Sequence, residues 1–163
     1  MYIPPSPFQM QQSLNNLEKY FHINDKDILV QTAIIHAQFE IIHPFLDGNG
    51  RIGRLLIPLF MYSKGLLSYP SFYMSEYFSL EKEKYYTHLH GISENGNWNN
   101  WIVFFLDAVI KQAKINLSKV QQIIQLYEKI KELIQKEVHT HHFIDITDFI
   151  FCKPAFKASE FAK

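Results

Sequence analysis

Residues 43–54, read HPFLDGNGRIGR, are the stretch on which the fold and the chemistry of this chain depend. The stretch opens with a His-Pro pair, passes through a Gly-Asn-Gly turn at 48–50, and ends in a segment that carries Arg51 and Arg54. Glycine and asparagine tolerate positive φ, and a proline disfavours helical backbone in the residue before it. Residues 43–50 therefore predict a loop between two helices.

Apolar residues recur at helical spacing on both sides of this loop. They predict a mostly buried helix that has its start signal at Asn24-Asp25 and ends at about Ile42. They also predict a second helix from Arg51 to Gly65, a natural residue to end a helix. The remaining chain predicts further helices over 7–21, after a cap at Ser75 to about Ser93, from Asn97 or Asn99 onward, and along an amphipathic stretch from Val120 to Ile134. No strand pattern stands out, so the sequence indicates an all-α protein.

Composition excludes several classes of protein. Of 163 residues, 47% are hydrophobic and 15% aromatic, which is too apolar for a disordered chain. Cys152 is the only cysteine, so there is no disulfide scaffold, and a reducing, cytoplasmic location is expected. Sixteen basic residues balance sixteen acidic ones, which argues against binding nucleic acid mainly through its phosphates. No segment approaches the roughly 20 apolar residues of a membrane-spanning helix.

The loop combines residue types that suit a bound polyphosphate. A glycine turn at 48–50 leading into a helix start offers free N–H groups and the positive end of the helix dipole. Arg51 and Arg54 lie three apart, on nearly one face, and guanidinium groups suit phosphate oxygens. Asp47 is a candidate Mg²⁺ ligand beside bound phosphates, and His43 is a candidate general base at neutral pH.

Two other kinds of site are excluded by the spacing. A P-loop needs a lysine followed by serine or threonine after its second glycine, and no lysine follows the glycines here. A calcium-binding EF-hand loop that began at Asp47 would need an oxygen ligand at its fifth position and glutamate at its twelfth. Arg51 and Pro58 occupy those positions.

Residues 43–54 resemble the signature of Fic-domain proteins, which is His-Pro-Phe-x-[Asp/Glu]-Gly-Asn-Gly-Arg-x-x-Arg, and every specified position matches. The likeness continues outside the motif, in residues 37–40, 66–70, 85–86 and 98–106. It covers about residues 2–115, and we therefore expect a catalytic Fic domain over 1–118. Residues 119–163 would be a C-terminal helical extension whose end, from residue 140, resembles the start of a winged-helix module.

The resemblance implies an all-α, Fic-type helical bundle with the active-site loop between two central helices and at most a small β-hairpin. It also implies a protein adenylyltransferase, which moves AMP from Mg·ATP to a Ser, Thr or Tyr hydroxyl of a target protein and releases pyrophosphate. By position in the motif, His43 would deprotonate the hydroxyl and Asp47 would hold Mg²⁺. Phe45 would anchor the loop.

The remaining motif positions would bind ATP. The resemblance implies that Arg51 neutralises the leaving diphosphate and that Arg54 holds the γ-phosphate. Tyr86 resembles the family's aromatic residue near the nucleotide base, with plain core packing as the alternative. The other residues expected in the phosphate-binding segment are Gly48, Asn49, Gly50, Ile52 and Gly53.

The chain departs from the family in its regulation. Many Fic proteins carry an inhibitory [Ser/Thr]-x-x-x-Glu-[Gly/Asn] helix whose glutamate pairs with the second motif arginine, here Arg54. Residues 79–83 have the serine-to-glutamate spacing of this motif, but Lys84 stands where Gly or Asn is required, so we expect the inhibitory motif to be missing here. We expect the family's target-docking flap to be missing as well. A kinase branch of the superfamily usually has lysine after the motif asparagine, and Gly50 argues against it.

The resemblance also implies partners: a target protein with a hydroxyl side chain, the chain itself as a substrate, and a separate inhibitory chain. The apolar stripe between Val120 and Ile134 is expected to be core or a packing face for a second copy in a homodimer. Neither a membrane nor nucleic acid is expected as a partner of this segment. The alternative function is an inactive or regulatory Fic fragment that acts as an interaction or DNA-linked module.

Overall fold

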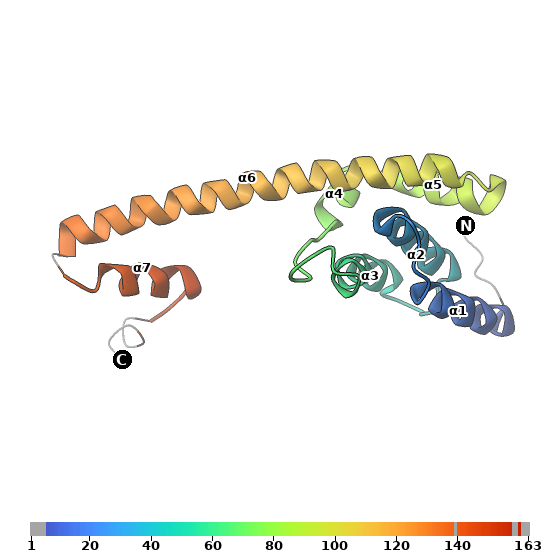
Figure 1. The fold of residues 1–163 in the computed structure, drawn as a ribbon, viewed down its shortest axis with the longest axis horizontal. Helices are drawn as coiled ribbons and strands as arrows, with labels where there is room; N and C mark the ends of the chain where they lie inside the picture. Colours follow the sequence, from blue (N-terminus) through green and yellow to red (C-terminus); the bar gives the residue numbers. More distant parts are fainter. Residues whose placement is uncertain (1–5, 139, 158–159, 161–163) are drawn as a thin grey trace. The chain divides into compact units, whose positions relative to one another are not determined.

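The computed structural model describes residues 6–138, 140–157 and 160, and these fold into helices without a strand. The all-α prediction is therefore confirmed, and the small β-hairpin does not occur in the described part of the chain. Figure 1 shows the helices in chain order. Their bounds are α1 Pro7–Phe21, α2 Ile28–Ile42, α3 Asn49–Ser63, α4 Ser75–Leu80, α5 Lys82–Asn95, α6 Trp98–Val138 and α7 Phe143–Cys152.

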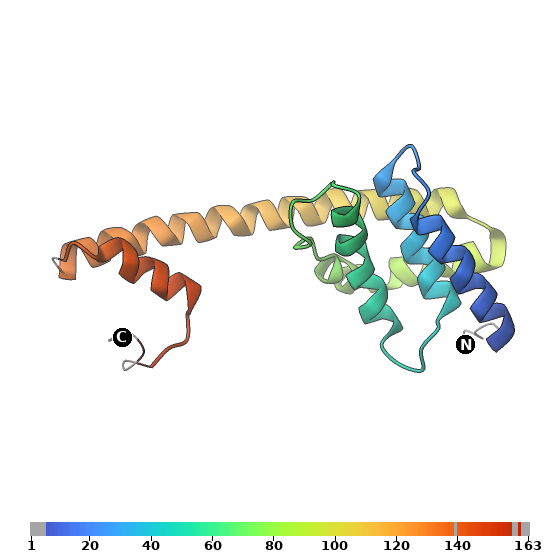
Figure 2. The same ribbon diagram turned by 60° about the horizontal axis from the view of Figure 1, so that its bottom comes forward.

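Helix α2 is the central element of the first part of the chain, and α1 and α3 pack against it (Figures 1 and 2). It starts at Asp27, whose carboxylate accepts the N–H groups of Leu29 (2.8 Å) and Val30 (3.1 Å). Its residues are apolar nearly all round, as expected of a buried helix. The predicted start signal at residues 24–25 therefore lies just before the real cap.

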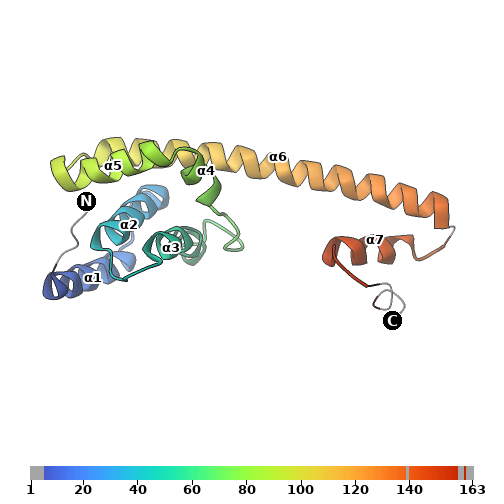
Figure 3. The ribbon, with the colours of Figure 1, turned by 180° about the vertical axis from the view of Figure 1, so that it is seen from behind.

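Two hydrophobic clusters hold this part together. The smaller one joins α1, α2 and α3 around Leu17, Phe39 and Phe60. The larger one lies on the other side of α2, where α5 runs back along the first part of α6 (Figure 3). Trp101 is completely buried there, and its indole Nε1 donates to the carbonyl oxygen of Ala33 at 2.9 Å. The second cluster thus places α5 beside the end of α2.

The segment 75–93 differs from its prediction. The single expected helix is two helices, α4 and α5, separated at Glu81, where φ is −106° and ψ is 37°. Ser75 was expected to cap the helix, but it is the first helical residue and Met74 is the N-cap. The break turns Tyr77 and Phe78 of α4 and Tyr85 of α5 into the same core.

Helix α6 is one continuous helix of 41 residues where the sequence predicted two. The chain divides into two compact units, residues 1–113 and 114–163, and α6 contributes to both. The predicted boundary at 118/119 remains a prediction.

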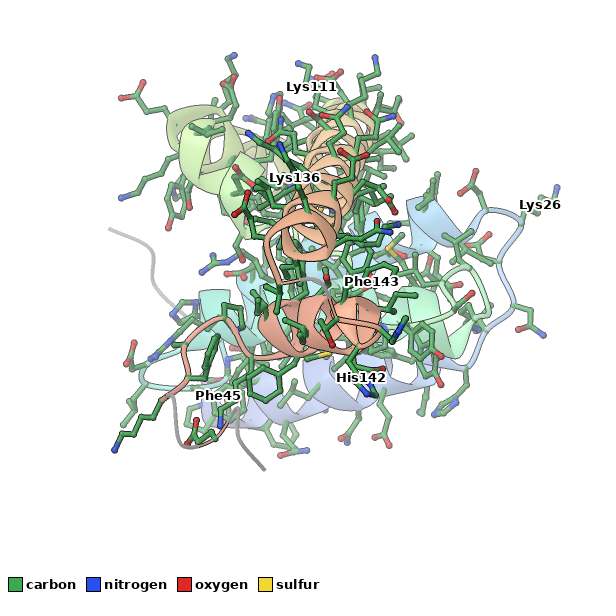
Figure 4. The ribbon with its side chains drawn as sticks, turned by 90° about the vertical axis from the view of Figure 1, so that its left-hand side faces the viewer. Lys26, Phe45, Lys111, Lys136, His142 and Phe143 are labelled. Atoms are coloured by element: carbon green, nitrogen blue, oxygen red, sulfur yellow. The ribbon has the colours of Figure 1, made fainter. Side chains whose placement is uncertain are left out.

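In the second unit, the Tyr127 hydroxyl of α6 donates to Asp148 of α7 at 2.6 Å, and its ring meets Phe151 edge-on. His142 and Phe143 mark the beginning of α7 in Figure 4. The rest of the segment that resembles a winged-helix start includes residues 158–159 and 161–163, which lie outside the described residues.

Within the described residues, no helix is both long enough and apolar enough to cross a lipid bilayer.

Candidate functional site

The motif loop connects the end of α2 to the start of α3 (Figure 2). His43 is the C-cap of α2 and adopts left-handed backbone, with φ 50° and ψ 57°. It is the only described non-glycine residue with positive φ, a conformation that costs roughly 1–2 kcal/mol. Strained backbone of this kind clusters at functional sites. The side chain is exposed, which is compatible with the expected role of a base.

The hydrogen bond of the His43 ring indicates its tautomer. Nδ1 lies 3.4 Å from the carbonyl oxygen of Glu40, one turn earlier in α2. A carbonyl oxygen can only accept, so Nδ1 carries the hydrogen and Nε2 is the basic nitrogen. This tautomer is the one that leaves the outer nitrogen able to accept a proton.

Asn49 closes the loop. Its amide nitrogen donates to the carbonyl oxygen of Phe45 at 2.5 Å, and its amide oxygen accepts the Phe45 N–H at 2.9 Å. Asn49 is 2% exposed, so this pair of bonds is shielded from water. The expected contact of Asn49 with an α-phosphate would have to use its second amide hydrogen. Phe45 itself is 48% exposed, with its ring 6.4 Å from that of Phe39.

The start of α3 offers backbone groups that suit an anion. Gly48 is its N-cap with φ 87°, a conformation that favours glycine. Ile52 donates its N–H to the Gly48 carbonyl oxygen at 3.0 Å, and the N–H groups before it have no acceptor within the helix. We call residues 48–50 the glycine nest.

Both motif arginines fold back toward the N-terminal end of α3. The Arg51 guanidinium lies 3.5 Å from the point where a Cβ of residue 48 would be. The Arg54 guanidinium lies 3.1 Å from the corresponding point at Gly50. Side chains on a helix lean toward its N-terminus, so this placement follows from the spacing. Two positive charges and the free N–H groups therefore converge on the nest.

Asp47 stands at the edge of the nest. One carboxylate oxygen accepts the Gly48 N–H at 2.7 Å, and the other pairs with Arg51 at 3.0 Å. The Asp47 side chain is 91% exposed, and among the described residues no group of three metal-binding side chains occurs. One exposed carboxylate suits Mg²⁺ that is held mainly by phosphate oxygens, so the donor set fits the expected ion.

A cavity of about 200 Å³ lies beside the nest. It brings together His43, Gly50 and Tyr86, which are far apart in sequence. Tyr86 is 49% exposed, so the alternative of plain core packing does not describe its position. The other lining residues are Glu40, Ile41, Leu89, His90 and Ser93.

Ile52 and Gly53 face away from the nest. Ile52 packs against the smaller hydrophobic cluster, and Gly53 is buried. A Cβ at residue 53 would collide with the Oε1 atom of Glu40 and lie 3.3 Å from Phe39. Any contact of these two residues with ATP would therefore come from their backbone.

Three residues of the cavity were not predicted as site residues: Glu40, His90 and Ser93. Glu40 carried a readable signal, because it is the only acidic residue in helix α2 and lies three residues before His43. His90 and Ser93 follow Tyr86 at helical spacing on α5, so the face of α5 was predictable only once Tyr86 was placed.

Comparison with known proteins agrees with the motif. Residues 1–61 match the model of the Fic/DOC family. A probable protein adenylyltransferase of Aquifex aeolicus is 27% identical over 140 residues, which is 83% of this chain and 39% of that protein. Proteins named protein adenylyltransferase Fic are 28% identical in Drosophila erecta and 27% in Drosophila melanogaster, each over 83% of this chain and 26% of the relative.

The chain thus spans less than half the length of these relatives. The family match covers the whole motif loop, and the similarity to the relatives extends well past it. The chain thus carries the complete Fic motif in an all-α fold, and over that part it is similar to Fic-domain proteins.

Proposed function

We propose that this chain transfers AMP from Mg·ATP to a hydroxyl group of a protein and releases pyrophosphate. One observation carries the proposal: Arg51 and Arg54 fold back over two glycines of the nest, next to the exposed base His43. Nucleotidyl transfer asks a protein chiefly for positioning and charge stabilisation, and this arrangement supplies both. The relatives' printed name, protein adenylyltransferase, supports the same reaction.

Each residue has one role in the proposed reaction. The N–H groups of the nest bind the α- and β-phosphates, and Arg54 takes the γ-phosphate. Arg51 stabilises the negative charge that develops on the leaving pyrophosphate. His43 accepts the proton of the attacking hydroxyl at Nε2. The cavity beside the nest receives the nucleoside, with Tyr86 against the base.

Asp47 is the residue that would hold Mg²⁺, and the ion would supply charge neutralisation between the α- and β-phosphates. Asp47 and Arg51 pair with each other at 3.0 Å in this structure. In the proposed complex the two part, because Arg51 turns to the phosphates. Exposed ion pairs contribute little free energy, so this exchange costs little.

The partners remain proposals. A target protein presents the Ser, Thr or Tyr hydroxyl, and the chain itself is a second candidate substrate. A second copy in a homodimer and a separate inhibitory chain are the proposed regulators. We place the reaction in the cytoplasm, where the single exposed Cys152 stays reduced.

Label transfer tests the proposed reaction. The chain is incubated with Mg²⁺ and ATP labelled at the α-phosphate, with and without added proteins, and protein-bound label is measured. Label on the protein is expected, and His43→Ala should lower it by about 10²–10⁴ while Mg·ATP still raises the melting temperature. Equal AMP transfer by the wild type and the His43→Ala variant would contradict the role of His43.

Two other outcomes point to other functions. Protein-bound label from γ-labelled ATP alone would indicate a kinase. No label together with no melting shift at millimolar Mg·ATP would favour the inactive or regulatory fragment. If a shift occurs and Arg54→Ala removes it, the nest is the ATP site.

A further inference from the structure

Glu40 lies behind the glycine nest, and no step of the proposed reaction uses it. It is half-buried and lines the cavity together with His43 and Gly50. Its Oε1 atom is shielded from water and has no hydrogen-bond partner among the described residues. A buried carboxylate oxygen without a partner is costly, so a native structure that keeps one calls for an explanation.

The Tyr85 hydroxyl lies within hydrogen-bonding reach of the Glu40 side chain, but it is also bound to His36. His36 is completely buried, and its Nδ1 lies 2.9 Å from the carbonyl oxygen of Gly53. Because that oxygen can only accept, Nδ1 carries the hydrogen of the neutral ring. Nε2 must then accept the proton of the Tyr85 hydroxyl, 3.0 Å away. The Tyr85 proton is therefore already committed to His36.

Positive charge is the larger compensation for an ionised Glu40. Burial raises the pKa of Glu40, and the charge of Arg54, followed by the charge of His43 and a hydrogen bond with Tyr85, opposes that rise. The groups that face Glu40, or share its cavity or its hydrogen-bond network, come from three helices: His36 and His43 of α2, Arg54 of α3, and Tyr85, Tyr86 and His90 of α5. Of these, only Arg54 carries a permanent positive charge.

We propose that Glu40 is a positioning residue that holds Arg54 over the nest as its counter-charge, and that it takes up a proton from solvent when a triphosphate replaces it as the partner of Arg54. The inference rests on the proposed function, because it requires Mg·ATP to bind at the nest. For each Mg·ATP that binds, the Glu40 carboxylate gains up to one proton from solvent.

The direction of the proton transfer follows from charge. Bound phosphates neutralise Arg54, so the half-buried carboxylate loses its counter-charge and faces added negative charge. An ionised carboxyl in that position is strongly disfavoured, whereas a neutral one is not. The neutral carboxyl also has an acceptor, because the Tyr85 oxygen interacts with Glu40 and its own proton points to His36. Binding and protonation therefore favour each other.

Calorimetry measures this coupling directly. Mg·ATP is titrated into the full chain in buffers of different ionisation enthalpy, at several pH values between 5.5 and 8. The reference protein is His43→Gln, since it removes the transfer reaction and leaves one ionisable group fewer beside Glu40. Glu40→Gln and His90→Gln are each added to this reference. His90 lines the same cavity, so its replacement is the matched control.

We expect the reference to take up protons with Mg·ATP, reaching a sizeable fraction of one proton per site at some pH in this range. Adding Glu40→Gln should abolish that uptake, while adding His90→Gln should leave it. Over the pH range in which protons are taken up, the Kd of the reference protein for Mg·ATP should increase by up to tenfold for each unit by which the pH increases, because binding consumes a proton.

The Kd profile needs no Glu40 variant, so it tests the inference even if that variant folds poorly. Binding with no uptake at any pH, or uptake unchanged by Glu40→Gln in a folded protein, would overturn the inference and leave the proposed function standing. No binding of Mg·ATP at all would overturn both.

Discussion

The Arg54 guanidinium lies 3.1 Å from the point where a Cβ of Gly50 would be. This contact joins the end of the motif to its glycine nest, and it explains why the two residues belong to one site. Arg54 is the sixth residue of α3, and it can reach the phosphates only if Gly50, one turn earlier, leaves room.

Gly50→Ala should weaken Mg·ATP binding without lowering stability. The added methyl group meets the guanidinium and also keeps phosphates from the nest. Gly50 is helical, and alanine in a helix is favoured over glycine by up to about 1 kcal/mol. We expect an unchanged or higher melting temperature and at least a tenfold increase in Kd by calorimetry. A variant that binds as tightly as the wild type would contradict the close approach of phosphate to this residue.

Gly53→Ala should have the opposite pattern, because its Cβ would enter the core against Glu40 and Phe39. Overpacking of this kind typically costs about 1–3 kcal/mol. For a chain of this size, that lowers the melting temperature by roughly 2–4 °C per kcal/mol.

The colliding partner can be identified by a double-mutant cycle. In a Glu40→Ala background, Gly53→Ala should cost clearly less free energy of unfolding, because the carboxyl group in its way is gone. Equal costs in the two backgrounds would show that Phe39 or the backbone, rather than Glu40, makes the conflict.

The sequence was sufficient for the loop and its two helices because their signals are local. The apolar run before Pro44 and the Gly-Asn-Gly turn each act within a few residues. The break at Glu81 was not readable, because the periodicity continues through it and only the shared core of α4 and α5 requires the bend. Similarly, two predicted helices proved to be the single helix α6.

The difference between local signals and tertiary contacts also decides which site residues could be predicted. Motif residues were found by their spacing, whereas Glu40 matters through contacts with Gly53 and Tyr85 that lie 13 and 45 positions away in the chain. Tertiary contacts of this range leave little trace in a single sequence. The left-handed backbone of His43 was also unforeseen, since the proline after it signals only that the helix ends.

Asp47→Asn should separate magnesium use from folding. The Asp47 side chain is 91% exposed and its ion pair with Arg51 lies at the surface, so the melting temperature without ligand should change by about a degree or less. AMP transfer should require a much higher Mg²⁺ concentration for half-maximal rate, since an amide oxygen is a weaker ligand than a carboxylate. An unchanged Mg²⁺ dependence would exclude Asp47 as the metal ligand.

His36 should make the protein less stable in mild acid. Burial lowers the pKa of His36 to about 4, against the opposing hydrogen bond to the Gly53 carbonyl. Unfolded chains bind the proton below about pH 6.5, whereas the folded protein does not until about pH 4. The stability associated with neutral His36 is therefore complete above pH 6.5 and is lost as the pH falls toward 4, by up to about 1.4 kcal/mol per pH unit.

Urea unfolding at pH 7 and pH 5 measures this slope. His36→Gln can still donate to Gly53 and accept from Tyr85, so it should fold and lose less stability over the same range. The raised pKa of Glu40 acts in the opposite direction, favouring the folded state as the pH falls. Glu40 is present in the wild type and in His36→Gln, so its contribution largely cancels when their stabilities are compared. His90→Gln, at an exposed position of α5, should keep the wild-type slope. Equal slopes in wild type and His36→Gln would mean that His36 is protonated in the folded protein, and the tautomer assigned to it would be wrong.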